Sequence, residues 1–391
     1  MTIDKGTRAS YDRTGVSTLT GIADGDMAEH RNDPGRDADE SRWPLVLSDQ
    51  GCFYVGGRYS DDTDTMTGQV FVQYQIPADL RYPFPVVMIH GGGQTGAGFL
   101  STPDGRRGWA DNFVAHGFAV YVVDVPGRGR AQGHDQVGAV RPATAVAGRV
   151  RADRSAPAWP QAHLHTQWPG NGRRGDPTFD QFYASQVSSS ADADSVELAM
   201  RDAGAALLDK IGPAVLLTHS LGVPFGWQIG DVRPDLTHAI VAIEPNGPPV
   251  YDVRFTPEPE WFDDADLARP WGITQTPITY SPPAELADEL SFERQERPDG
   301  PGLVRYWRQA EPARRLPNLA RLRILIVSGE ASYHAPYDHA TSAYLTQAGV
   351  EHDFVRLADR GIRGNGHMMM LEKNNADIAR LLREWILSSP S

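Results

Sequence analysis

The sequence predicts an α/β fold in which a mostly parallel sheet is flanked by helices. Short apolar runs with the length of buried strands recur along the chain, and several end in a glycine-rich or charged turn. Segments with helical spacing separate these runs, a pattern typical of parallel strands joined by helices. The 391 residues are enough for one large domain with insertions.

Individual elements follow from local periodicity. Residues 52–59 and 69–75 alternate apolar and polar side chains, which predicts an antiparallel hairpin at a sheet edge. The later predicted strands are residues 85–90, 119–123, 214–219, 238–243, 322–327 and 353–357, and the predicted helices are residues 109–116, 193–210, 342–348 and 376–387.

Two long segments, 131–190 and 247–318, show little periodicity and are too long for plain loops in a compact domain. Both leave from the carboxyl ends of predicted strands, where ligand sites of α/β sheets lie. We therefore expect these insertions to form one cap over the site. The remaining predicted core consists of residues 49–130, 191–246 and 319–391.

Composition excludes several classes of protein. The formal charge of −13 argues against a nucleic-acid or anionic-membrane partner, and no apolar run is long enough to span a membrane. Residues 1–48 are polar and are predicted to form a flexible arm without a signal-peptide core. The single cysteine, Cys52, cannot form an internal disulfide. Together these features favour a cytoplasmic location.

The stretch 214–222 carries the clearest chemical signal. An apolar strand is followed by Ser220, then by Gly222 and a segment that can start a helix. A serine on a sharp turn between a strand and a helix is the nucleophile elbow of α/β-hydrolases. Thr218 stands where the usual motif has a glycine, so the motif is incomplete. The sequence thus predicts an α/β-hydrolase fold with a cap built from the two insertions, and Ser220 as nucleophile.

A serine nucleophile needs an acid and a histidine, which follow it in the chain in this fold. His367 lies between the last predicted strand and the last helix, where the fold delivers its histidine. Two acids compete: Glu330 ends the strand after the second insertion, and Glu244 ends the strand before it. Position alone slightly favours Glu330. His334 and His339 precede the last strand and are set aside.

An oxyanion hole needs backbone N–H donors. One should be the N–H of Leu221, directly after the nucleophile, and the other should come from the glycine-rich turn after strand 85–90. Gly92 is the candidate, with Gly93 as the alternative. His90 is expected to anchor this turn.

Several motifs together resemble a known group of enzymes. They are residues 90–96, 109–110, 121–130, 218–220, 244–249 and 364–375. These segments are similar to those of the bacterial and fungal α/β-hydrolases related to the Alcaligenes esterase called 713, and the resemblance covers about residues 50–390.

The resemblance implies an acid after the sixth strand, which matches Glu244 and reverses the preference for Glu330. It also implies Ser220 as nucleophile and His367 as base. One departure is that the named esterase has two adjacent cysteines where this chain has glycines at 92–93. The long N-terminal extension and aromatic insertions also resemble an actinobacterial lactonase that acts on the macrolactone zearalenone.

These observations predict a serine hydrolase that cleaves a hydrophobic, aromatic ester or lactone without a cofactor. His, Cys, Asp and Glu do not cluster with zinc-ligand spacing, so no metal is expected. The alternatives are an amidase or thioesterase with the same triad, or a hydrolase-fold binding protein without activity. A homo-oligomer is an open option. The candidate pocket residues are Trp159, Trp168, Trp261, Trp271 and Trp307.

Overall fold

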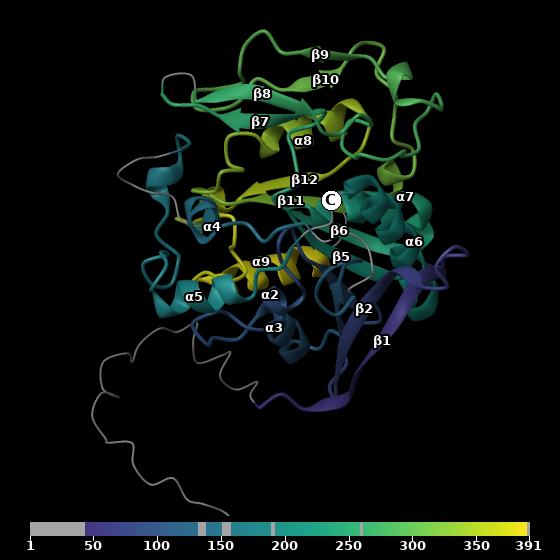
Figure 1. Cartoon of the computed structure of the whole chain (residues 1–391), viewed down its shortest axis with the longest axis vertical. Coiled ribbons are helices and arrows are strands. Elements are labelled where there is room, and N and C mark those ends of the chain that lie inside the picture. The colour runs from purple at the N-terminus through teal and green to yellow at the C-terminus, as the bar shows by residue number, and fades with distance from the viewer. Residues whose placement is uncertain (1–43, 132–137, 151–157, 189–191, 259–260, 389–391) are drawn as a thin grey trace, which may run out of the picture. The chain divides into compact units, whose positions relative to one another are not determined.

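The structure, a computed structural model, describes residues 44–131, 138–150, 158–188, 192–258 and 261–388 (Figure 1). Its central sheet has eight strands in the order β1-β2-β4-β3-β5-β6-β11-β12. β1 pairs antiparallel with β2, β2 pairs antiparallel with β4, and the other neighbours are parallel. The strands are β1 (Leu47–Tyr59), β2 (Met66–Pro77), β3 (Val86–Ile89), β4 (Val120–Asp124), β5 (Ala214–His219), β6 (Thr237–Ile243), β11 (Ile324–Ser328) and β12 (Asp353–Arg356).

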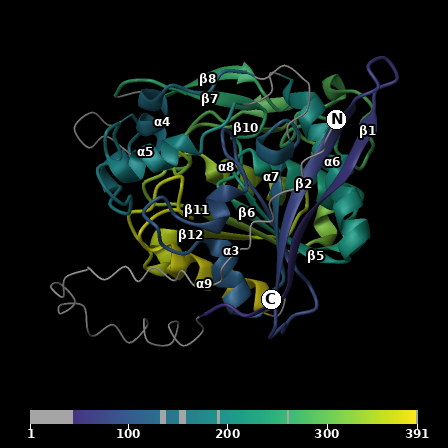
Figure 2. The same ribbon diagram turned by 60° about the horizontal axis from the view of Figure 1, so that its bottom comes forward.

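This arrangement confirms the predicted α/β-hydrolase fold, including the antiparallel hairpin at the sheet edge. Figure 2 shows β1 and β2 side by side at that edge, with α6 next to them. The helices of the described residues are α2 (Ala97–Leu100), α3 (Trp109–Ala115), α4 (Ala143–Val150), α5 (Pro177–Ala184), α6 (Ala193–Ile211), α7 (Gly222–Val232), α8 (Asp338–Gln347) and α9 (Asn375–Leu387).

Hydrophobic packing covers both faces of the sheet because successive strand residues point to opposite sides. On β3, Val87 and Ile89 pack in a cluster with apolar side chains of α6 and α7. Val86 and Met88 pack in the other cluster, with side chains of α3 and α9. All four residues of β3 are buried, which explains why the strand is a continuous apolar run rather than an alternating one.

The parallel register places several chain segments at one edge of the sheet. Thr218 near the end of β5 pairs with Ile89 of β3 and with Ala242 of β6. At the end of β6, Ile243 pairs with His219 and with Val327. The segments that leave β3, β5, β6 and β11 therefore begin next to one another.

The two insertions contain regular elements that the sequence did not predict. The first carries α4 and α5, and the second carries two antiparallel pairs of short strands. These pairs are β7 (Tyr251–Phe255) with β8 (Phe262–Leu267) and β9 (Phe292–Arg294) with β10 (Trp307–Gln309). Figure 1 shows them grouped near α8 and away from α3 and α9. Such short elements leave too few residues for a detectable period.

The predicted arm, residues 1–48, lies almost entirely outside the described residues. Pro44–Ser391 forms one compact unit, and the boundaries between core and cap within it remain predictions. Among the helices in the described part of the chain, none combines the length and hydropathy needed to cross a membrane.

Candidate active site

Ser220 lies at the sharp turn between β5 and α7. Its φ of 53° is in the left-handed region, which is unusual for a residue other than glycine and indicates local strain. The chain can turn here only because Gly222 has no side chain: a Cβ at this position would be 2.7 Å from the carbonyl oxygens of Ile89 and His90. The Ser220 N–H donates to the Ile243 carbonyl at 2.9 Å, so β6 fixes the turn.

Thr218 replaces the first glycine of the usual elbow motif, and the structure shows how it is accommodated. Its side chain points toward α7, where residue 226 is a glycine. A Cβ at Gly226 would be 2.9 Å from Thr218 Cγ2. The usual motif has a glycine on the strand at this contact, whereas here the glycine is on the helix and the strand residue has a side chain. The Thr218 hydroxyl donates to the Val241 carbonyl at 3.3 Å.

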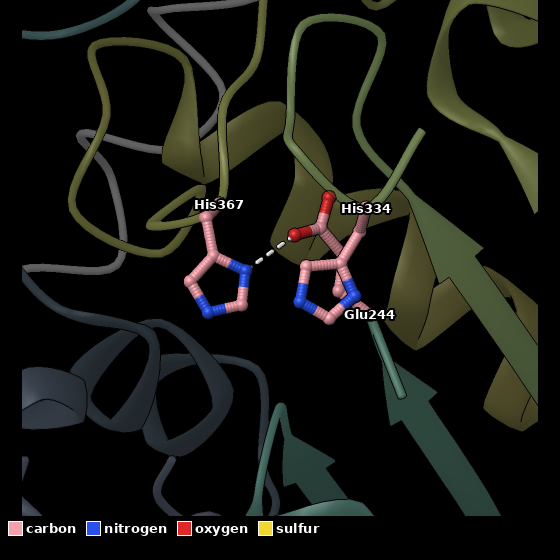
Figure 3. A group of neighbouring side chains, drawn as sticks. All are labelled: Glu244, His334 and His367. Carbon is pink, nitrogen blue, oxygen red and sulfur yellow. Dashed lines mark hydrogen bonds and ion pairs between the residues drawn. The ribbon is translucent and has the colours of Figure 1, made fainter. Parts of the chain in front are cut away.

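His367 and Glu244 form a buried pair at the same edge of the sheet. His367 Nδ1 is 2.6 Å from Glu244 Oε2, as the dashed line in Figure 3 shows. The segment after β11 supplies two further donors to Glu244: the Gly329 N–H to Oε1 at 2.8 Å and the Ser332 hydroxyl to Oε2 at 2.6 Å. Glu244 itself has a positive φ of 47° directly after β6.

The competing acid, Glu330, is bound elsewhere. One of its oxygens is 2.8 Å from the Arg363 guanidinium, and the other accepts the Gly364 N–H at 2.8 Å. Glu330 therefore holds the start of the loop that carries His367, whereas the carboxyl group in contact with the imidazole is that of Glu244.

Neighbouring rings surround His367. His219, next to the serine, donates its Nε2–H to the His367 carbonyl at 3.0 Å, and their ring centroids are 4.5 Å apart. The rings of Tyr333 and His334 lie 4.7 Å and 4.6 Å from that of His367. His219 therefore ties the elbow of Ser220 directly to the histidine loop.

Burial governs the protonation of the pair. It lowers the pKa of His367 well below its usual value, and the neighbouring rings of His219 and His334 and the guanidinium groups of Arg149 and Arg141 act in the same direction. Burial raises the pKa of Glu244, while the Ser332 and Gly329 donors favour its carboxylate form and oppose the shift. The site thus disfavours an imidazolium at rest. A neutral imidazole that donates Nδ1–H to Glu244 leaves Nε2 able to accept a proton.

A second buried carboxylate shapes the loop of His367. Glu372 accepts the Gly366 N–H at 2.9 Å and the Asn365 side-chain amide at 2.7 Å. His165, from the first insertion, places Nε2 2.7 Å from Glu372 Oε1. The first insertion is therefore bonded to the histidine loop inside the protein, a contact that the sequence did not reveal.

The turn after β3 lies beside the serine elbow. A Cβ at Gly92 would be 3.6 Å from Leu221 Cδ2, so the two residues are neighbours. Within the described residues, neither the Gly92 N–H nor the Leu221 N–H has a recorded acceptor. Gly93, the alternative donor, is bonded to the first insertion, because its carbonyl accepts the Val187 N–H at 3.0 Å. His90 accepts the Val125 N–H at 3.2 Å and thus anchors the turn, as expected.

The five predicted pocket tryptophans lie in different surroundings. The ring centroids of Trp159 and Tyr333 are 6.0 Å apart, and Tyr333 in turn packs against the His367 ring. Of the five tryptophans, Trp159 is therefore linked to His367 through one intervening ring. Trp168 and Trp271 are buried within the two main hydrophobic clusters. Trp307 packs on Tyr251 and donates to Asp264, whereas Trp261 is half-buried after β7 with a positive φ of 60°.

Among the described residues, one group could hold a metal ion. One ligand atom each of Glu244, His334 and His367 lies within 4.8 Å of the others (Figure 3). Both oxygens of Glu244 already accept hydrogen bonds, and His334 Nδ1 is 3.0 Å from Asp338 Oδ1. A cation here would have to break the bond between His367 and Glu244, so the contacts fit a hydrogen-bonded site better than a metal site.

Sequence reasoning missed the residues that support Glu244. Ser332, His334 and Asp338 all follow β11; Ser332 bonds Glu244, which lies 88 residues earlier, whereas His334 and Asp338 bond each other. The predicted parallel order of the strands could have indicated them. In a parallel sheet the segments after the strands all start at one edge, which is where Ser220 lies.

The comparisons with known proteins agree with the fold. Residues 86–381 match the alpha/beta hydrolase family. A probable secreted lipase named phiG, from a fungal species (strain ATCC 74256), is 44% identical over 339 residues, which are 85% of this chain and 88% of that protein. The atomic-resolution structure of a novel bacterial esterase has a TM-score of 0.58 and 24% identity, and the match covers 88% of this chain and 96% of that one. The chain therefore belongs to the alpha/beta hydrolase family.

Proposed function

We propose that the chain is a serine hydrolase that cleaves a carboxylic ester or lactone through an acyl-enzyme. The main support is the 2.6 Å contact between His367 Nδ1 and Glu244 Oε2 at the sheet edge where the strained Ser220 lies. The name of the fungal relative, a probable lipase, supports ester hydrolysis.

In the proposed reaction, Ser220 Oγ attacks the carbonyl carbon while His367 Nε2 takes its proton. Glu244 holds the imidazole and stabilises the imidazolium that forms. The N–H groups of Gly92 and Leu221 bind the oxyanion. His367 then gives the proton to the leaving alkoxide, and a water molecule activated by the same imidazole releases the acyl group. With a lactone the alcohol stays attached to the acyl group. No step needs a metal, so we expect activity to survive chelators.

The proposed substrate is hydrophobic and aromatic, with the macrolactone zearalenone as the specific candidate. Support comes from the aromatic path that leads from His367 through Tyr333 to Trp159. Membership in the esterase 713 group is supported by Glu244, which follows strand β6 as the acid of that group does. The cytoplasmic location remains a prediction, and the name of the fungal relative describes a secreted protein.

Covalent labelling tests the proposed mechanism. A fluorophosphonate probe should label the full chain at Ser220, and Ser220→Ala should lose both the label and nearly all turnover while it keeps the fold. Labelling of the variant at the wild-type rate would exclude Ser220 as nucleophile. Rates for an ester, an amide and a thioester of one acyl group decide between an esterase and an amidase or thioesterase.

A further inference from the structure

A second histidine–carboxyl pair lies directly beside the first. His334 Nδ1 is 3.0 Å from Asp338 Oδ1, and the two side chains are 2% and 0% exposed. The ring of His334 is stacked on that of His367, with the centroids 4.6 Å apart and the planes 8° from parallel (Figure 3). The proposed reaction has no step that uses this second pair.

The surroundings favour an uncharged form of the pair. Burial lowers the pKa of His334 to about 4 and raises the pKa of Asp338 well above its usual value. The Ser328 side chain opposes the shift of the Asp338 pKa, but Asp338 Oδ2 has no well-formed hydrogen bond in the described part of the chain, which would be costly for a buried carboxylate. A protonated Asp338 that donates to Nδ1 avoids the cost of a buried charge.

The backbone of His334 also acts on the acid of the first pair. Its N–H donates to Ser332 Oγ at 3.1 Å, and the Ser332 hydroxyl in turn donates to Glu244 Oε2 at 2.6 Å. The same oxygen is bonded to His367 Nδ1. The Ser332 hydroxyl thus accepts from the His334 N–H and donates its one proton to Glu244. His334 therefore contacts both members of the catalytic pair, one by its ring and the other through a hydroxyl.

We propose that His334, held by Asp338, is a positioning residue that keeps the His367 ring aligned between Glu244 and Ser220. This inference rests on the proposed serine-hydrolase function. The flat face of His334 restricts rotation of the His367 ring, and a neutral ring there adds no charge against the imidazolium that forms during attack. Asp338 fixes the plane of His334.

Four variants separate alignment from simple structural support. His334→Ala removes the stacked ring, and His334→Phe keeps a flat ring without hydrogen bonds. Asp338→Ala removes the donor to Nδ1, and Asp338→Asn keeps one because an amide can donate as a protonated acid does. His352→Ala is the control, since this histidine bonds Ser342 of the same helix α8.

We expect kcat of His334→Ala and Asp338→Ala to fall about tenfold to hundredfold with little change in KM, because small misalignments of a catalytic group cost that much. Asp338→Asn should recover most of kcat, His334→Phe should recover only part because it keeps the flat face without the bond to Asp338, and His352→Ala should resemble the wild type. A folded His334→Ala or Asp338→Ala protein with kcat within about twofold of wild type would overturn the proposal, as would conservative variants that are no better than alanine.

A proton NMR spectrum of the free protein gives a readout independent of turnover. The His367 Nδ1–H in its short bond to Glu244 should give a downfield signal, which is identified by its loss in Glu244→Gln. This signal should shift or broaden in His334→Ala and return in His334→Phe. An unchanged signal in a folded His334→Ala protein would refute the alignment. Failure of the fluorophosphonate to label Ser220 would refute the serine mechanism instead, so the two failures are distinguishable.

Discussion

At the scale of residues, the acid beside His367 comes from the end of β6, and the segment after β11 provides donors for it. The Gly329 N–H and the Ser332 hydroxyl both donate to Glu244. They flank Glu330, the acid that position in the sequence alone had favoured. The neighbouring Glu330 is instead bonded to Arg363 and to the backbone of the histidine loop.

This arrangement predicts an unequal effect of two matched substitutions. Glu244→Gln should lower kcat by about 10⁴-fold, because an amide neither fixes the imidazole tautomer nor stabilises the imidazolium. Glu330→Gln should cost much less, since its carboxylate bonds a loop and not the ring. Steady-state kinetics of the two variants, with thermal unfolding as a check on folding, decide the point. The reverse order of losses would assign the acid to the later strand.

The pH dependence of the reaction should follow the lowered pKa of His367. The base works only when it is neutral, so kcat/KM should fall as the pH drops through that pKa. Since burial, His219 and His334 all lower the pKa from 6.5, the acid limb should have its midpoint below pH 6.5. The charge on Arg149 also lowers it, so Arg149→Gln should move the limb to higher pH. A wild-type midpoint at or above pH 6.5 in the pH–rate profile would contradict this prediction.

At the scale of elements, the strands of the core and most of its helices could be predicted from a clear period or a continuous apolar run, whereas the four-residue helix α2 was not predicted. For example, the predicted helix 193–210 is observed as α6, Ala193–Ile211. The short strands of the second insertion could not be predicted, because β9 and β10 have only three residues each.

The residues of the candidate site were predictable to different degrees. Ser220 and His367 could be singled out because an elbow and a loop between known elements mark them. Choosing Glu244 required a family resemblance, since its contact with His367 spans 123 residues. Ser332 could not be predicted, because its role depends on the hydrogen bond from its hydroxyl to Glu244. Glu244 lies 88 residues earlier in the chain, and only the pairing of β11 in the sheet brings the two residues together.

The elbow offers a compensation test between strand and helix. Gly226→Ala should destabilise the fold by about 1–3 kcal/mol, since the added methyl would overpack against Thr218 Cγ2 at 2.9 Å. Thr218→Gly restores the usual motif and frees that space, so the double variant should regain part of the loss. Denaturant unfolding of the two single variants and the double variant measures the coupling. Additive losses would show that the two positions do not share this space.

The histidine loop provides a second test at this scale. Glu372→Ala leaves the Gly366 N–H and the Asn365 amide without their acceptor, which should cost about 1–3 kcal/mol for each group. The same change should lower kcat, because this loop carries His367. Asp377→Ala, at the exposed start of α9, is the control and should lower neither the stability nor kcat. Wild-type stability and kcat in Glu372→Ala would show that the loop does not depend on this carboxylate.

At the scale of the whole unit Pro44–Ser391, the two insertions and the catalytic segments meet at one tryptophan. Trp159 of the first insertion packs on Phe255 of β7 and on Tyr333, each at 6.0 Å. Its indole N–H donates to the Ala331 carbonyl at 3.1 Å, in the segment that supports Glu244. The two insertions are therefore joined next to the proposed reaction centre, as a cap over a substrate would require.

This junction predicts the kind of substrate. An aromatic lining lowers the cost of desolvating an apolar, aromatic group, so kcat/KM should be higher for zearalenone or a short-chain aryl acetate than for a dicarboxylate monoester. The comparison is informative because Arg141 and Arg149 also act electrostatically on His367, and a cationic pocket would favour the charged ester. Trp159→Phe should change KM for the lactone more than for the acetate, since only the larger substrate extends from His367 past Tyr333. If the monoester is the best of the three substrates, the hydrophobic pocket is wrong. If only the aryl acetate reacts, the macrolactone is wrong and the ester hydrolase stands.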